Sequence, residues 1–320
     1  MNVLVTGGAG FIGSHIVECL LNEGGHAVRV VDNLSSGRLE NIQPFLDKID
    51  FLHGDLLEDD VRTRALRDIE IVFHLAARPS VPYSIKNPLE SHGSGAHLTL
   101  LLLNSARNSV RRLIYAGSSS AYGNMGTLPA REDALPSPLS PYAASKLAGE
   151  YYVSSFARCY GIDTVVLRYF NVFGPRQDPS SAYSGVIAKF CTAVLNDLPL
   201  EIFGDGSQSR DFTYVENVVR ANMLAARAPK PLGGQVINIA CGEACSLNEM
   251  LGLLNELTGK NRSATFGAAR SGDIVHSLAE ITRAKNVLGY SPTVGFREGL
   301  AKTLDWYRSY SASSNSSSSI

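Results

Sequence analysis

One stretch of sequence decides the fold of this chain: Val3-Leu4-Val5-Thr6-Gly7-Gly8-Ala9-Gly10-Phe11-Ile12-Gly13. Its first residues form a short apolar run, which is typical of a buried parallel strand. The glycines that follow fit both the G-x-G-x-x-G and the wider G-x-x-G-x-x-G spacing, which bring a tight turn and a helix start close to a pyrophosphate. The stretch therefore predicts a strand, a glycine-rich loop and a helix that together bind a dinucleotide.

A second predicted strand supports this dinucleotide site. A helix is expected over residues 11–22, and the strand expected over residues 27–31 ends on Asp32, about 20 residues past the glycines, where an acid accepts hydrogen bonds from ribose hydroxyls. Asp32 would repel a 2′-phosphate, and no arginine follows it directly. The sequence therefore favours NAD over NADP as the cofactor, although Arg38 lies nearby.

Composition and charge narrow the class of protein. The chain has 320 residues, of which 44% are hydrophobic, and a formal net charge of -1. This length suits one large or two modest domains, and so small a charge does not indicate a nucleic-acid partner or a membrane surface. No stretch reaches the roughly 18 to 20 apolar residues of a membrane span, and the apolar start is too short and glycine-rich for a signal peptide. We therefore expect a cytoplasmic protein. The five cysteines lack metal-ligand spacing, so we expect reduced thiols and no metal site.

Other strand ends supply candidate cofactor contacts. The strand expected over residues 49–53 is followed by Asp55, an acid placed to meet the adenine amino group, and the strand over residues 69–75 is followed by two small alanines that let the dinucleotide pass. The polar loop after Asp32 is interpreted as a contact to the adenosine end or as a plain connection, and His74 as a core histidine. The candidate cofactor residues in this half of the chain are Gly7, Gly10, Phe11, Ile12, Asp32, Asn33, Ser35, Gly37, Asp55, Leu56, Leu75, Ala76 and Ala77.

Three serines follow the next strand, which is expected over residues 112–116. Because ligands of an open parallel sheet bind beyond the carboxyl ends of its strands, Ser118, Ser119 and Ser120 are expected to face the nicotinamide end of the cofactor. Ser118 is the expected catalytic serine because it lies four residues before Tyr122, and Ser120 is the competing choice.

A tyrosine and a lysine open the helix expected after this loop. Tyr142 and Lys146 stand at positions i and i+4 and therefore share one helix face. The ammonium can stabilise a phenolate and lower the pKa of Tyr142 from its usual value of about 10. Together with the glycine loop, Asp32 and the serines, the two residues form the expected catalytic pair, with Tyr142 as general base.

The segment 97–110 is predicted to form a helix with an unusually apolar middle. Residues 100–103 are all leucine. A helix that is apolar around most of its circumference is buried on more than one side. We therefore expect it to pack against the sheet and against a partner subunit, which indicates a homodimer.

Taken together, these motifs resemble the extended branch of the short-chain dehydrogenase/reductase family and, within it, the nucleotide-sugar 4-epimerases. The resemblance covers nearly all of residues 1–310. It implies an α/β fold: a Rossmann-like doubly wound parallel sheet, with a smaller α/β carboxyl-terminal substrate domain. The NAD-binding domain is expected over residues 1–170 plus about 212–243 and the UDP-sugar domain over 171–211 plus about 244–310, followed by a disordered serine-rich tail, 311–320. It also implies a homodimer formed through two helices and NAD that stays bound through turnover.

The resemblance also assigns roles to residues of the second half. Tyr169 is expected near the nicotinamide, Arg210 and Arg270 on the sugar diphosphate, and Asp273 on the uridine ribose. Ser277 falls at the position that lines the pocket beside the C2 substituent of the sugar, where a small residue leaves room for an N-acetyl group. The substrate residues implied are Ser80, Ser118, Ser119, Ser120, Asn171, Phe203, Arg210, Arg270, Asp273 and Ser277.

The expected reaction is reversible epimerisation at C4 of a UDP-hexose, with UDP-GlcNAc and UDP-GalNAc among the substrates. Tyr142 takes the proton of the 4-hydroxyl, Ser118 bridges that hydroxyl, and Lys146 holds the tyrosine and the nicotinamide ribose. A UDP-glucuronate 4-epimerase or related enzyme is the alternative, although no group that recognises a carboxylate is plain. A 4,6-dehydratase would need an acid pair where Ser119 and Ser120 stand, and a non-catalytic dinucleotide sensor would not need the tyrosine and lysine.

Some positions depart from the family pattern. At the head of the helix before the fifth strand, Gly95, His97 and Leu98 stand where relatives usually carry an asparagine and a Gly-Thr pair. Asn217 stands where many relatives have an aspartate. One contact on the nicotinamide side is therefore not expected to follow the family.

Overall fold

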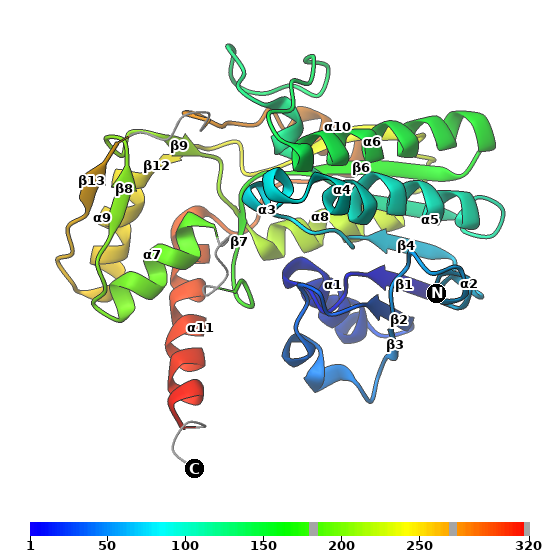
Figure 1. Ribbon diagram of the computed structural model, residues 1–320, viewed down its shortest axis with the longest axis horizontal. Helices are drawn as coiled ribbons and strands as arrows, with labels where there is room; N and C mark the ends of the chain where they lie inside the picture. Colours follow the sequence, from blue (N-terminus) through cyan, green and yellow to red (C-terminus); the bar gives the residue numbers. More distant parts are fainter. Residues whose placement is uncertain (179–184, 269–273, 317–320) are drawn as a thin grey trace.

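The computed structural model describes residues 1–178, 185–268 and 274–316, the last six of these by their backbone alone. Its centre is a parallel sheet of seven strands, in the order β11-β6-β5-β4-β1-β2-β3 (Figure 1). The order reverses between β1 and β4, so the sheet is doubly wound, as predicted. The strands are β1 Asn2–Thr6, β2 Ala27–Asp32, β3 Asp50–His53, β4 Ile71–His74, β5 Arg112–Ser118, β6 Asp163–Tyr169 and β11 Gln235–Ile239.

Helices cover both faces of this sheet. Side chains alternate along each strand, so Val3 and Val5 of β1 enter the core beneath α1 (Phe11–Glu23) and α8 (Val215–Arg227). Leu4 enters the opposite core, beneath the helices of the other face. These are α2 Asp59–Leu66, α5 Leu98–Ala106 and α6 Pro141–Tyr160.

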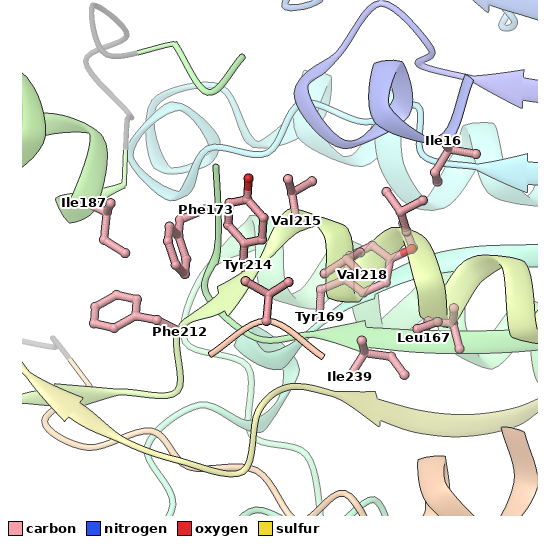
Figure 2. Close-up of a cluster of buried hydrophobic side chains, with 14 of the residues drawn as sticks. Ile16, Leu167, Tyr169, Phe173, Ile187, Phe212, Tyr214, Val215, Val218 and Ile239 are labelled. Atoms are coloured by element: carbon pink, nitrogen blue, oxygen red, sulfur yellow. The ribbon is translucent and has the colours of Figure 1, made fainter. Parts of the chain in front are cut away.

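Three two-stranded sheets lie beside the large one, at the left of Figure 1 and toward its centre. The apolar core beneath α8 continues into this part, where Phe173 and Phe212 pack near Ile187 (Figure 2). The pairs are β7 Val172–Phe173 with β10 Thr213–Tyr214, β8 Glu201–Phe203 with β13 Thr265–Gly267, and β9 Ser209–Arg210 with β12 Cys245–Ser246. The helices of this half are α7 Val186–Leu195, α9 Leu247–Thr258, α10 Thr282–Leu288 and α11 Phe296–Ser316.

Short helical segments complete the connections. They are η1 Leu39–Asn41, η2 Gln43–Phe45, α3 Val81–Lys86, α4 Pro88–His92, the π-helix Gly93–His97 and η4 Ser119–Tyr122. None of the helices in the described part of the chain has the length and apolarity needed to cross a membrane.

The serine-rich tail differs from its prediction, because α11 continues to Ser316. This helix contains no proline, and it contains no glycine after Gly299. Each residue added to an existing helix closes one further hydrogen bond, which favours its extension. Residues 317–320 lie outside the described part of the chain.

The helix predicted over residues 97–110 begins differently, with the π-helix Gly93–His97 before α5. The Ser145 hydroxyl of α6 accepts a hydrogen bond from the Ala96 N–H at 2.9 Å and donates to the Ser91 carbonyl at 3.2 Å. Because the Ala96 N–H donates to a side chain of another helix, it is lost from the regular backbone hydrogen bonds of its own helix. This is a recognised cause of a π-helical turn. A Cβ atom on Gly95 would collide with the same hydroxyl, which explains the glycine at this position.

Asn217, the second departure from the family pattern, is fully buried in α8. Its side chain hydrogen-bonds the backbone just before α11. Its side-chain oxygen accepts the N–H groups of Thr293 and Val294 at 2.8 and 3.1 Å, and its Nδ2 donates to the Val294 carbonyl at 2.7 Å. This position needs an acceptor and a donor on one side chain, which asparagine has and an ionised aspartate lacks.

Replacing Asn217 with aspartate should therefore destabilise the fold. A carboxylate cannot donate to the Val294 carbonyl, and we expect a loss of about 2–4 kcal/mol of unfolding free energy at pH 7.5. Burial would raise the pKa of the new carboxyl in the folded state, so the penalty should be small below about pH 4 and grow as the pH rises through that raised pKa. Urea unfolding of the variant and of the original protein at pH 5 and 7.5 measures this difference, and a penalty independent of pH would contradict the assigned bond.

Candidate active site

A cavity of about 1340 Å³ lies at the carboxyl ends of the large sheet's strands. Every predicted cofactor residue lines it: Gly7, Gly10, Phe11, Ile12, Asp32, Asn33, Ser35, Gly37, Asp55, Leu56, Leu75, Ala76, Ala77, Tyr142, Lys146 and Tyr169. The predicted substrate residues Ser80, Ser118, Ser119, Ser120, Asn171, Arg210 and Ser277 line it as well. Phe203 instead lines a neighbouring cavity of about 410 Å³, and Arg270 and Asp273 lie outside the described residues.

Asp32 holds the glycine loop against the end of β2. Its carboxylate accepts the Ala9 N–H at 3.0 Å and the Leu34 N–H at 2.8 Å. Burial raises the pKa of Asp32, and these two backbone hydrogen bonds oppose the shift. The carboxylate is thereby fixed at the edge of the cavity, where a ribose would lie.

Arg38, the residue that left NADP open, pairs with side chains from distant parts of the chain. It donates to the Asp178 carboxylate at 2.5 Å and to the Tyr310 hydroxyl at 3.2 Å. This ion pair engages the guanidinium that a 2′-phosphate would need, so the arrangement agrees with NAD.

Two polar side chains lie at the end of the cavity that is predicted to bind the adenosine. Asn33 donates to the Asp55 carboxylate at 3.0 Å, and Asp55 also accepts the Leu57 N–H at 2.9 Å. The loop after β2 and the end of β3 are thus joined beside the cavity.

The catalytic end is built on the first turns of α6. Ser140 caps the helix by accepting the Ala143 N–H at 3.2 Å, which places Tyr142 in the first turn, facing the cavity. One turn later, the Lys146 ammonium donates to the Ala116 carbonyl of β5 at 2.8 Å. Tyr142 hydrogen-bonds Ser118 at the end of the same strand.

The three serines are not equivalent in this arrangement. Ser118 contacts Tyr142 directly, whereas Ser120 donates its hydroxyl to Ser118 Oγ at 2.8 Å. Ser120 is therefore one hydrogen bond further from the tyrosine, which favours Ser118 as the serine that would bridge a substrate hydroxyl.

The expected lowering of the Tyr142 pKa is not found in this structure. Burial raises the pKa of Tyr142, and the hydrogen bond with Ser118 opposes the shift only in part. Burial also lowers the pKa of Lys146 to about 8, against the attraction of Glu150. The prediction failed because spacing places the ammonium on the right face but says nothing about desolvation.

On the sugar side, Arg210 and Ser277 lie on adjoining segments. Arg210 donates to the Ser209 and Val275 carbonyls at 2.9 and 3.1 Å, and the Ser277 N–H donates to the Ser209 carbonyl at 3.0 Å. Asn171 lines both cavities and has a positive φ of 32°, a conformation that asparagine tolerates better than most residues.

Asp211 is a residue of this region that we did not predict. Its buried carboxylate accepts the N–H groups of Cys241, Gly242 and Ala279 at 2.9, 3.0 and 3.1 Å. The only sequence signal was its place between Arg210 and Phe212. Its bonds tie the Arg210 strand, the end of β11 and the Ser277 segment together.

Comparison with known proteins decides the family. The model of the NAD dependent epimerase/dehydratase family matches residues 3–240 of this chain. The chain belongs to this family. Its members use NAD, and the predicted cofactor residues, including the glycine loop, Asp32 and Asp55, line the cavity described above.

Solved structures of this epimerase/dehydratase family superpose over almost the whole chain. The UDP-glucose 4-epimerase of Thermotoga maritima, solved with UDP-glucose, is 40% identical with a TM-score of 0.91, covering 97% of this chain and 99% of that one. The UDP-N-acetylglucosamine 4-epimerase of Methanobrevibacter ruminantium, in complex with UDP-N-acetylmuramic acid, is 40% identical with a TM-score of 0.91, covering 97% and 98%. The UDP-glucuronic acid 4-epimerase of Bacillus cereus, with UDP-glucuronic acid and NAD, is 35% identical with a TM-score of 0.90, covering 97% and 100%.

Replacing Asp32 with alanine should weaken the retention of NAD. The change removes the acceptor for the ribose hydroxyls and releases the Ala9 N–H of the glycine loop, so less NAD should stay with the purified protein. Enzymatic assay of the NAD released per chain on heat denaturation measures this. Asp50→Ala is the matched control, because Asp50 pairs with Arg29 at the start of β3, at the far end of that strand; equal loss in both variants would contradict the role of Asp32.

Proposed function

We propose that this protein interconverts the C4 epimers of UDP-hexoses through a transient 4-keto sugar, and that UDP-GlcNAc and UDP-GalNAc are among its substrates. The observation that carries the proposal is the contact of Tyr142 with Ser118, one turn from the buried Lys146, inside the cavity lined by the predicted NAD-binding residues. Its coarser part, an NAD-dependent UDP-sugar 4-epimerase, agrees with every relative described above.

The residues of α6 and β5 would carry the proton steps. Ser118 would bridge the 4-hydroxyl to Tyr142, and the Tyr142 oxygen would take its proton when phenolate forms. Lys146, still protonated below about pH 8, would stabilise that phenolate. NAD supplies the hydride acceptor when it is bound. A sugar anchored only through its diphosphate can then turn and present its other face, so that hydride return inverts C4.

The two cavities suit the two ends of a UDP-sugar. Asn171 and Arg210 line both, so one ligand can pass from one cavity to the other. We propose that Arg210 holds the diphosphate by its guanidinium and that the smaller cavity, lined by Phe203, takes the uridine. Arg270 and Asp273 stay part of the proposal as family expectations.

A uronate substrate fits the lining less well. Among the described lining residues, the cations besides Lys146 are Arg38, Arg78 and Arg210. Arg38 is paired with Asp178, which itself adds negative charge to the lining. Arg78 lies over Tyr83, 3.6 Å from Glu90, and donates to the Ser35 carbonyl on the cofactor side. UDP-glucuronate therefore stays the alternative substrate.

We also propose a homodimer. Helices α3, α4 and α6 expose large apolar side chains: Ile85 is 63% exposed, Leu89 85% and Tyr151 59%. Residues 100–101 of α5 are only partly buried. A second copy would cover these side chains. The cytoplasmic location stays a prediction from the sequence.

The experiment that tests the function incubates the purified protein with UDP-glucose, UDP-galactose, UDP-GlcNAc, UDP-GalNAc and UDP-glucuronate, without added NAD. Chromatography that separates the epimers should show interconversion of the first four. Turnover that consumes NAD in proportion to product would identify a dehydrogenase instead, and conversion of UDP-glucuronate alone would favour the alternative.

Tyr142→Phe should abolish epimerisation while leaving the fold and the bound NAD intact. Only the proton acceptor is removed, so kcat should fall by about 10²–10⁴-fold or more. Tyr160→Phe is the matched control, since Tyr160 ends the same helix with an exposed side chain. Substantial activity in Tyr142→Phe would sink the assigned base.

Ser277→Tyr should divide the substrates by size. If Ser277 borders the C2 substituent, a tyrosine side chain would clash with an N-acetyl group, and turnover of UDP-GlcNAc and UDP-GalNAc should be lost while UDP-glucose and UDP-galactose are still converted. Ser277→Ala, which keeps the site small, should leave both pairs of substrates unchanged. Equal losses on both pairs, or none on either, would show that this residue is not the gate.

A further inference from the structure

The catalytic face of α6 continues one turn beyond the lysine. Tyr142, Lys146 and Glu150 stand at i, i+4 and i+8, so they form a single stripe along the helix. Glu150 is only 1% exposed and meets Arg168 of β6, which is 3% exposed. The guanidinium donates three hydrogen bonds to the carboxylate at 2.7, 2.9 and 3.1 Å. Such burial is costly for an ion pair and calls for a reason.

The pair lies directly behind the strand end that forms the site. A backbone hydrogen bond from Ser118 reaches the Glu150 carboxylate. Residue 117 is a glycine, and a Cβ atom there would lie 3.0 Å from Glu150 Oε1 and 2.8 Å from a Val166 methyl group. The absence of a side chain lets the carboxylate approach β5 between Ala116, which holds Lys146, and the catalytic serine.

Three titratable groups that pack around the pair are neutral at pH 7, and the buried Glu132 carboxylate acts on one of them, Tyr122. Tyr115 of β5 lies 5.0 Å from Lys146 Nζ, and burial holds its pKa far above its usual value. Tyr122 lies beneath the Arg168 guanidinium at 4.5 Å, and burial raises its pKa too. His74 of β4 is buried with its pKa lowered to about 3. Among the described charged groups, those that act on Glu150 are Arg168 and Lys146.

We propose that Glu150 and Arg168 are a positioning pair that sets the protonation state of Lys146 and, through it, of Tyr142. The carboxylate, one turn from the lysine, keeps the buried ammonium charged. Arg168, on the far side, holds the carboxylate ionised and in place. The proposal rests on the proposed function only in taking Tyr142 as the base.

The two charges act on Lys146 with opposite signs. Glu150 favours the ammonium against burial, which already lowers the pKa of Lys146 to about 8. Without Glu150, the ammonium would face burial and an unpaired guanidinium, and it would lose its proton at lower pH. If Arg168 is removed as well, the repulsion disappears and part of the loss should be recovered.

The test compares Glu150→Gln with the double variant Glu150→Gln/Arg168→Gln in the NAD-loaded protein. In Glu150→Gln, the alkaline limb of the kcat against pH profile should move by about one pH unit or more toward neutrality. In the double variant it should lie between those of the single variant and the original protein. Arg168→Lys, which keeps both charges, should leave the limb near its original place. If Glu150→Gln does not fold, the double variant carries the test alone. Its alkaline limb should still lie at lower pH than that of the original protein.

A second buried pair in the same strands is the matched control. Arg112 begins β5 and Asp163 begins β6, and the two meet at 2.6 Å at the opposite edge of the sheet from the site. Asp163→Asn should cost stability but leave the pH profile unmoved. Two results would overturn the proposal. One is an alkaline limb that moves no further in Glu150→Gln than in Asp163→Asn, and the other is a limb that is displaced as far in the double variant as in Glu150→Gln.

A measurement without substrate separates this inference from the proposed function. An NMR titration of the lysine side chains, with the Lys146 signal assigned by its loss in Lys146→Arg, reports the ionisation of Lys146 directly. In Glu150→Gln the Lys146 titration should move to lower pH, because no carboxylate then favours the buried ammonium. A shift in a protein that converts no UDP-sugar would refute the proposed function and support the positioning role. An active enzyme without such a shift would support the proposed function and refute the positioning role.

Discussion

The site depends on one hydrogen bond, from the Lys146 ammonium to the carbonyl oxygen of Ala116. It fixes α6 against the carboxyl end of β5, so that Tyr142, one turn earlier, lies beside Ser118. The same contact needs the ammonium to be buried, and burial lowers its pKa to about 8. Position and proton affinity are therefore coupled in a single side chain, and the carboxylate of Glu150 compensates for part of the burial.

The sugar side depends on a buried carboxylate rather than a buried cation. Asp211 collects three backbone N–H groups from two segments, and burial raises its pKa to about 6 against these bonds. The Asp211 carboxyl is therefore ionised at neutral pH and accepts all three hydrogen bonds. The segments that carry Arg210 and Ser277 are thus tied to the end of the large sheet.

The two departures from related sequences have local causes of the same kind. Gly95 leaves room for the Ser145 hydroxyl, which binds the Ala96 N–H and opens a π-helix. Asn217 offers the donor and the acceptor that the backbone at Val294 requires. In both cases a polar side chain hydrogen-bonds the backbone of a distant segment: Ser145 at Ala96, and Asn217 at Val294.

The sequence by itself determined the strand, glycine loop and helix that open the chain, the place of Asp32 at the end of the second strand, and the shared helix of Tyr142 and Lys146. These features depend on strand alternation and on helix spacing between residues close in the chain. Only the tertiary structure decided the raised pKa of Tyr142, the start of α5 and the meeting of Glu150 with Arg168. Each of these depends on burial or on a partner from another element, and spacing along the chain carries no information about desolvation or about which distant side chain fills a gap.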